Sequence, residues 1–223
     1  MNIPGILILF IFLPPLIYEG SAYTNVYKFS KHFLSGVVLA GPGVVIQTAL
    51  IGCVAKYIFP YNWGWVESFL FGGILSATDP IAIIALLKEL GCLPDLRVLI
   101  EAESILNDGT AIVVYELCYR IMVEPTGSVG DYVGQAFKLS LGGPAMGMIF
   151  CIATMFLLSM LHNPLLETTV TIAAAYLCFF AAQGSLGVSG VLAVMTLGVL
   201  LAMYGQAVIS HEAAHFLHVF WNY

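Results

Sequence analysis

Apolar runs long enough to cross a lipid bilayer recur along the whole sequence, and this pattern constrains the fold more than any other feature. A transmembrane helix needs about 20 mostly apolar residues to cross about 30 Å of hydrocarbon, and it satisfies its own backbone polar groups. Of all residues, 60% are hydrophobic and only 9% are charged, values far from those of soluble domains. The runs cover, approximately, residues 3–18, 33–59, 66–87, 96–122, 132–160, 166–183 and 188–204, and an eighth begins near His211. The sequence therefore predicts an all-α, multi-pass membrane protein with one transmembrane domain over residues 1–223, made of about seven helices and the start of another.

The charge, the cysteines and the first residues exclude other classes. Only 7 Lys and Arg stand against 13 Asp and Glu, so no basic patch supports nucleic-acid binding. The five cysteines are widely spaced and lie mostly inside apolar runs, where we expect them to act as small core side chains. The apolar stretch at residues 6–13 has no Lys or Arg before it, so we expect a retained membrane helix and not a signal peptide.

One apolar run, residues 66–87, carries a helix breaker and an acid at its middle. Pro80 removes a helical amide and crowds the preceding turn, so we expect the helix to unwind between Ser76 and Pro80. Freed backbone inside a membrane builds the ion sites of many secondary transporters. The alternative is a simple proline kink with no ion involved. Asp79, immediately before the proline, favours the ion site.

Polar side chains also interrupt the next run, in the stretch AESILNDGTAIVVYEL at residues 102–117. At 100° per residue, Ser104 and Asp108 share one helix face, and Glu103 and Asn107 form a second stripe beside it. An acid at the bilayer centre costs about 2.5–3.5 kcal/mol on insertion scales, so intramembrane carboxylates are candidates for function. This helix is therefore expected to present two adjacent polar edges.

Asp108 has no Lys or Arg within four positions to neutralise it. Burial of such a group favours the protonated carboxyl, and the same oxygens can instead hold a small hard cation such as Na⁺ or Li⁺. A site that accepts H⁺ or Na⁺, but not both, acts as a proton-coupled exchanger once it opens alternately to the two sides. The residues alone thus favour cation/proton exchange.

At these residues the chain resembles the monovalent cation/proton antiporter family, which contains the sodium/proton exchangers. GGILSATDPIAIIALLKELG and IEAESILNDGTAIVVYEL are most similar to the plant salt-overly-sensitive and the sperm-type exchangers. The family's broken helix carries a Thr-Asp-Pro triplet, matched by Thr78, Asp79 and Pro80. Its next motif, Gly-Glu-Ser-x-x-Asn-Asp, is matched by residues 102–108, with Ala102 in place of the glycine. The resemblance covers nearly the whole chain and implies a sodium/proton antiporter fold of the inverted-repeat type.

The resemblance implies a set of ion ligands. Asp108 would carry Na⁺ and the proton in turn, and Ser104 and the backbone of Thr78 would be further Na⁺ ligands. The stretch FLPPLIYEGS resembles the family's Leu-Pro-Pro helix, whose terminal acid is Glu19 here and is expected as another ligand.

Three other residues are implied to support the site. Asn107 and Asp79 would stabilise the unwound crossing, and Glu103 corresponds to the family glutamate that pairs with a later arginine. The Asn-Asp pair formed with Asp108, in place of an Asp-Asp pair, implies electroneutral one-for-one exchange.

Partners and location are expected from the same resemblance. The transported ions would be Na⁺ and H⁺, with Li⁺ and K⁺ left open, and the activity would serve pH regulation. We expect no enzyme activity, no cofactor and a location in the plasma membrane, and homodimerisation as in family members is left open. The aromatic residues of PYNWGW, residues 60–65, suit a loop at the lipid headgroups.

Family members have about a dozen or more helices in inverted repeats, and their second half supplies another broken helix and the arginine. This chain has no Arg after Arg120 and ends at Tyr223, so we expect an incomplete exchanger domain. A truncated, non-transporting fragment and a channel-like subunit are the alternatives.

A rival from another class comes from HEAAH at residues 211–215, which matches the zinc motif His-Glu-x-x-His. His211 and His215 would bind zinc and Glu212 would act as the base of an intramembrane protease. Only eight residues follow His215, which favours a solvated cluster at the membrane interface over zinc chemistry.

Overall fold

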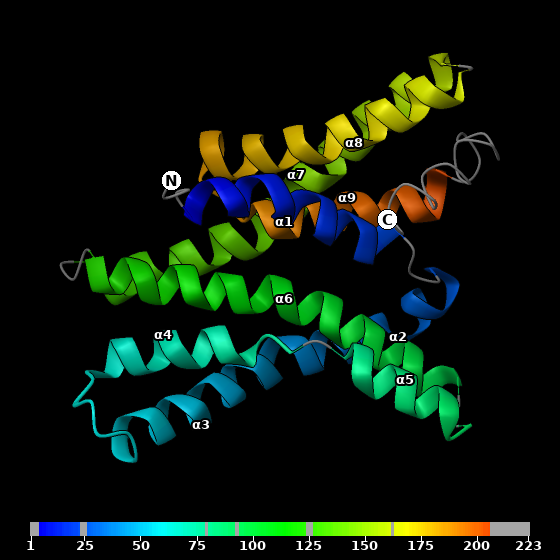
Figure 1. Cartoon of the computed structure of the whole chain (residues 1–223). Helices are drawn as coiled ribbons and strands as arrows, with labels where there is room; N and C mark the ends of the chain where they lie inside the picture. Colours follow the sequence, from blue (N-terminus) through cyan, green and yellow to red (C-terminus); the bar gives the residue numbers. More distant parts are fainter. Residues whose placement is uncertain are drawn as a thin grey trace. The chain divides into compact units, whose positions relative to one another are not determined.

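The computed structural model describes residues 5–22, 26–78, 80–91, 94–123, 127–161 and 163–205, and within these ranges all regular structure is helical (Figure 1). The helices are α1 (Gly5–Ala22), α2 (Val26–Val38), α3 (Val44–Tyr57), α4 (Trp65–Ser76), α5 (Ile81–Glu89), α6 (Pro94–Val123), α7 (Val129–Met160), α8 (Pro164–Phe180) and α9 (Gly190–Tyr204). Two π-helical turns, η1 (Leu39–Gly43) and η2 (Ala181–Leu186), continue α2 and α8. Helices correspond to each of the seven predicted apolar runs, with a break inside the run at residues 66–87, whereas the expected start of an eighth helix lies outside the described residues.

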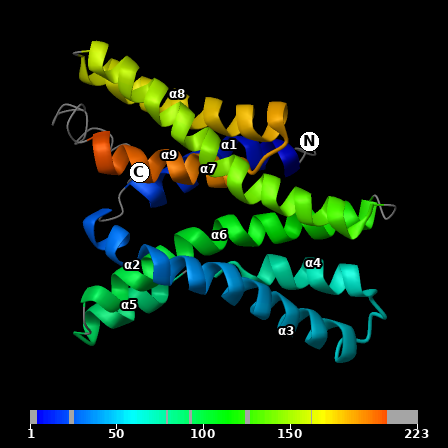
Figure 2. The ribbon, with the colours of Figure 1, turned by 180° about the vertical axis from the view of Figure 1, so that it is seen from behind.

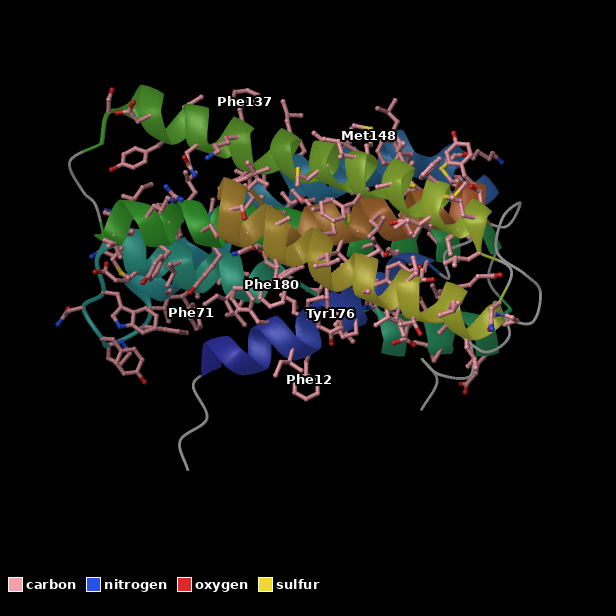
Figure 3. All side chains as sticks on the ribbon, turned by 90° about the horizontal axis from the view of Figure 1, so that it is seen from above. Phe12, Phe71, Phe137, Met148, Tyr176 and Phe180 are labelled. Atoms are coloured by element: carbon pink, nitrogen blue, oxygen red, sulfur yellow. The ribbon has the colours of Figure 1, made fainter. Side chains whose placement is uncertain are left out.

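Three helical stretches of the described part are long and apolar enough to cross a membrane. They are Phe29–Tyr57, Val129–Met160 and Pro164–Leu186, and Trp65–Ser76 and Gly190–Tyr204 are shorter apolar helices. Many large apolar side chains on these helices are exposed, and Figure 3 shows Met148 of α7 pointing away from the neighbouring ribbons. Such a surface suits lipid and not water.

The chain forms two compact units, one of residues 1–26 and 141–223 and the other of residues 27–140.

In the first unit, a hydrogen bond from α8 replaces a backbone hydrogen bond that a proline removes from α1. Pro15 has no N–H to donate to the carbonyl of Ile11, four residues earlier, and the hydroxyl of Tyr176 on α8 donates to that carbonyl at 2.7 Å. Figure 3 shows Tyr176 beside α1.

The second unit is built on a close antiparallel contact between α3 and α4, which lie side by side in Figures 1 and 2. A Cβ atom added to Gly72 would lie 2.5 Å from the carbonyl oxygen of Thr48 and 3.2 Å from the amide nitrogen of Gly52. The two backbones therefore touch, as small residues allow in membrane helices. α6 packs on the same hairpin, with Val114 against Gly73.

The connector between α3 and α4 gathers the aromatic residues that the sequence places at the membrane interface. The rings of Tyr61 and Trp63 stack with centroids 5.4 Å apart, and Trp65 opens α4 and stacks on Phe69 at 5.6 Å. Asn62 adopts a left-handed conformation with φ of 51°, which lets the chain turn between the helices. The lipid contact of this loop stays a prediction.

Candidate ion site at the helix break

The expected break in the second unit is confirmed between α4 and α5. α4 ends at Ser76, Ala77 is extended with φ of −72° and ψ of 110°, and α5 begins at Ile81. Pro80 precedes that helix, where its carbonyl accepts the amide of Ile84 at 2.8 Å, so its missing N–H costs no helical bond. Figure 1 shows this link as non-helical chain, and Asp79 lies outside the described residues.

α6 presents Asn107 to the broken backbone. Its side chain is completely buried, and its Nδ2 donates to the carbonyl oxygen of Ser76 at 3.0 Å and to the hydroxyl of Thr78 at 3.4 Å. The carbonyl groups at a helix end have no partner in their own helix, and in a membrane they need one from a neighbour. Asn107 supplies that partner.

Ser104, one turn earlier on α6, contacts a second carbonyl of the break. Its hydroxyl donates to the carbonyl oxygen of Thr78 at 3.4 Å, and the side chain is only 8% exposed. Ser104 and Asn107 are three positions apart and therefore lie on one face of the helix. The break thus brings a backbone carbonyl and two hydroxyls close together, all of them hard oxygen groups.

The amide of Asn107 has a defined orientation. Exchanging its oxygen and nitrogen would place two acceptors against each other at the Ser76 carbonyl. In the observed orientation Oδ1 is buried and has no hydrogen-bond partner. Glu103, half-buried on the preceding turn, also interacts with the Asn107 side chain through a hydrogen bond. Asn107 is therefore the centre of the polar cluster in this part of the chain.

Asp108 lies differently from the expectation. Its side chain is exposed, whereas the sequence predicts a buried carboxylate sharing the face of Ser104. The reason is the rotation of α6, which turns positions 104 and 107 to the break and moves the next residue by 100° to the edge of that face. The carboxylate remains adjacent in sequence to Asn107.

Two other sequence predictions are not tested by the structure of the second unit. Glu19 is half-buried on α1 in the first unit, so its role as a ligand stays a prediction. The proposed zinc residues His211, Glu212 and His215 lie outside the described residues. Within the part that is described, no group of three or more His, Cys, Asp or Glu side chains could hold a metal ion.

Sequence reasoning missed one polar contact of the break. Thr48 of α3 is buried, and its hydroxyl donates to the hydroxyl of Ser76 at 3.3 Å. The packing of α3 on α4 brings this threonine to the break. The polarity of "IQTAL" is the only signal that could have indicated it.

A helical membrane domain with a broken helix, crossed by a helix that satisfies the freed backbone, is typical of ion-coupled secondary transporters. The family model described as sodium/hydrogen exchanger, transmembrane, matches residues 6–223, and the chain belongs to this family. It is therefore an integral membrane protein, and the predicted family is confirmed.

Relatives agree with this assignment. The chain is 41% identical to sodium/hydrogen exchanger 7 of Arabidopsis thaliana over 217 residues, which cover 97% of this chain and 19% of the relative. It is 39% identical to exchanger 8 of the same plant, covering 97% of this chain and 29% of the relative. The low-affinity Na⁺/H⁺ antiporter NhaS1 of Synechocystis is 31% identical over 229 residues, covering 100% of this chain and 42% of the relative. The chain thus spans less than half the length of each of these curated relatives.

Proposed function

We propose that this chain carries the ion site of a Na⁺/H⁺ exchanger, with Asp108 as the group that binds Na⁺ and the proton in turn. The observation that carries the proposal is the hydrogen bonding of Ser104 and Asn107 into the helix break, by residues that precede Asp108 within one turn of α6. The relatives named as Na⁺/H⁺ antiporters support the same ions for this chain.

The proposed roles follow from the chemistry of each group. Ser104 and the carbonyl of Thr78 are the further Na⁺ ligands, because hydroxyl and carbonyl oxygens suit a hard cation. Asn107 and Asp79 stabilise the break, and Glu19 is a further ligand. Na⁺ and the proton compete for one carboxylate. After Na⁺ is released, the site therefore turns back to the other side of the membrane only when the carboxylate is protonated.

The same proposal covers the stoichiometry of transport, the cation and the location of the protein. One carboxylate that exchanges one Na⁺ for one H⁺ moves no net charge, so exchange is electroneutral and independent of voltage. The cation is Na⁺, with Li⁺ and K⁺ as competitors to be compared. The protein works in the plasma membrane, in contact with lipid.

Reconstitution into liposomes tests the proposal. We expect an imposed Na⁺ gradient to move protons in the wild-type chain, at the same rate when valinomycin and K⁺ clamp the voltage. Asp108→Asn should lower this rate more than about tenfold, since the site can no longer titrate. Glu116→Gln, which removes another acid of α6, is the matched control and should keep the wild-type rate.

Three results contradict the proposal. Wild-type rates in Asp108→Asn would exclude this carboxylate as the carrier. Na⁺ flux that continues without an opposing ion would support a channel-like subunit, and absence of any flux from correctly folded wild-type chain would support a non-transporting fragment.

A further inference from the structure

Ser76 joins three helices at the point where α4 ends. Its carbonyl oxygen accepts the side-chain amide of Asn107 on α6 at 3.0 Å. Its hydroxyl donates to the carbonyl of Gly73 in its own helix at 2.8 Å and accepts the hydroxyl of Thr48 on α3 at 3.3 Å. A continuous path of hydrogen bonds therefore leads from α3 through the last residue of α4 to α6.

The position of Thr48 in this path leaves little freedom. Its side chain is 4% exposed and that of Ser76 is 0% exposed, so no bulk water replaces either partner. The backbone of Thr48 also lies against Gly72, where an added Cβ would come within 2.5 Å of its carbonyl oxygen. The close contact of the two backbones at Gly72, one turn before the end of α4, thus holds the Thr48 hydroxyl in place.

We propose that Thr48 is a positioning residue for the ion site, acting from a helix outside the Thr-Asp-Pro and Glu-Ser-x-x-Asn-Asp motifs. It fixes the hydroxyl of Ser76 and, through this residue, the direction of the backbone that continues to Thr78. The carbonyl of Thr78 is the one that faces Ser104. This inference rests on the proposed function, because it assigns Thr48 to the same site.

The proposal predicts an effect on Na⁺ that differs from the effect on protons. Coordination of Na⁺ uses several oxygens at set distances, including the Thr78 carbonyl, whereas a proton binds to the carboxylate alone. Thr48→Val keeps the shape of the side chain and removes its hydroxyl. We expect the apparent KM for Na⁺ to rise about three- to tenfold, the range given by one lost hydrogen bond, with maximal rate and apparent proton affinity changed less than about twofold.

The experiment compares wild type with Thr48→Val, Thr48→Ser and the control Thr110→Val, in liposomes, at several Na⁺ concentrations and pH values. Thr110 is a suitable control because, in the described part of the chain, its hydroxyl donates to the carbonyl of Leu106 in its own helix, at 2.8 Å. Thr48→Ser retains the hydroxyl and should restore the wild-type KM. An unchanged KM in Thr48→Val, or equal KM values for the valine and serine variants, would overturn the proposal.

A second measurement does not depend on transport. Hydrogen–deuterium exchange of the peptide covering residues 70–80 should be at least about threefold faster in Thr48→Val than in wild type or Thr48→Ser, because the end of α4 opens more often. Equal exchange in all variants would overturn the inference even if Asp108→Asn behaves as proposed. If the wild-type chain transports no ions, the proposed function fails. Faster deuterium uptake in Thr48→Val would still support the positioning role of Thr48 at the end of α4.

Discussion

The side-chain nitrogen of Asn107 on α6 lies 3.0 Å from the carbonyl oxygen of Ser76, the residue at which α4 ends. A helix that stops inside a membrane leaves carbonyl groups without a donor, at a cost of several kcal/mol each in hydrocarbon. This contact between two helices supplies the donor, so the break and the crossing of α6 depend on each other. The motif residue Asn107 is therefore needed to keep the chain unwound at this place.

Replacement of Asn107 should destabilise the second unit. Asn107→Leu has a similar volume but no amide, so the Ser76 carbonyl stays buried without its donor, and we expect a loss of about 1–3 kcal/mol. This loss is measured as the change in the free energy of unfolding when the purified protein is titrated with a denaturing detergent. Thr110→Val is the control on the same helix, and equal stability of the two variants would show that Asn107 does not hold the break.

Ser104→Ala tests the Na⁺ ligands without removing the carboxylate. The hydroxyl of Ser104 donates to the Thr78 carbonyl at 3.4 Å, and its oxygen is free to face a cation at the same time. We expect the apparent KM for Na⁺ to rise about threefold or more, with proton-dependent behaviour retained. Ser104→Thr keeps the hydroxyl and should lie near wild type. A lower maximal rate with unchanged KM would contradict a ligand role.

Gly72→Ala should separate α3 from α4. The new methyl group would meet the backbone of Thr48 at 2.5 Å and that of Gly52 at 3.2 Å, and backbone atoms cannot move aside cheaply. We expect a loss of about 1–3 kcal/mol, measured by thermal unfolding in detergent. The matched control is Gly134→Ala in α7, where nothing lies within 4 Å. The control should be neutral or slightly stabilising, and an equally neutral Gly72→Ala would contradict the close contact.

Tyr176→Phe tests the hydrogen bond from α8 to α1 in the first unit. The variant keeps the ring and removes only the hydroxyl that donates to the Ile11 carbonyl at 2.7 Å, which Pro15 leaves without a helical donor. We expect a loss of about 0.5–1.5 kcal/mol in unfolding free energy, the usual net contribution of one hydrogen bond. Combining it with Pro15→Ala, which restores the helical amide, should recover most of the loss. Additive effects of the two substitutions would exclude the proposed compensation.

Local patterns predicted the helices and the break closely. The sequence predicts unwinding of the run at residues 66–87 between Ser76 and Pro80, and in the structure α4 ends at Ser76 and α5 begins at Ile81. This succeeded because the lost amide and the crowding by the ring of Pro80 act within one turn. The apolar run at residues 96–122 likewise corresponds to α6, Pro94–Val123, because hydrophobicity and length are local properties.

Local sequence features thus predict the helices, the position of the break and the polar stripe of α6, since each depends on neighbouring residues. The contacts between helices add that Ser104 and Asn107 both donate hydrogen bonds to the broken backbone. They also bring Thr48 to the end of α4. The physical reason is that contacts between helices depend on how each helix is rotated and crossed by its neighbours, which no periodic pattern along one segment specifies.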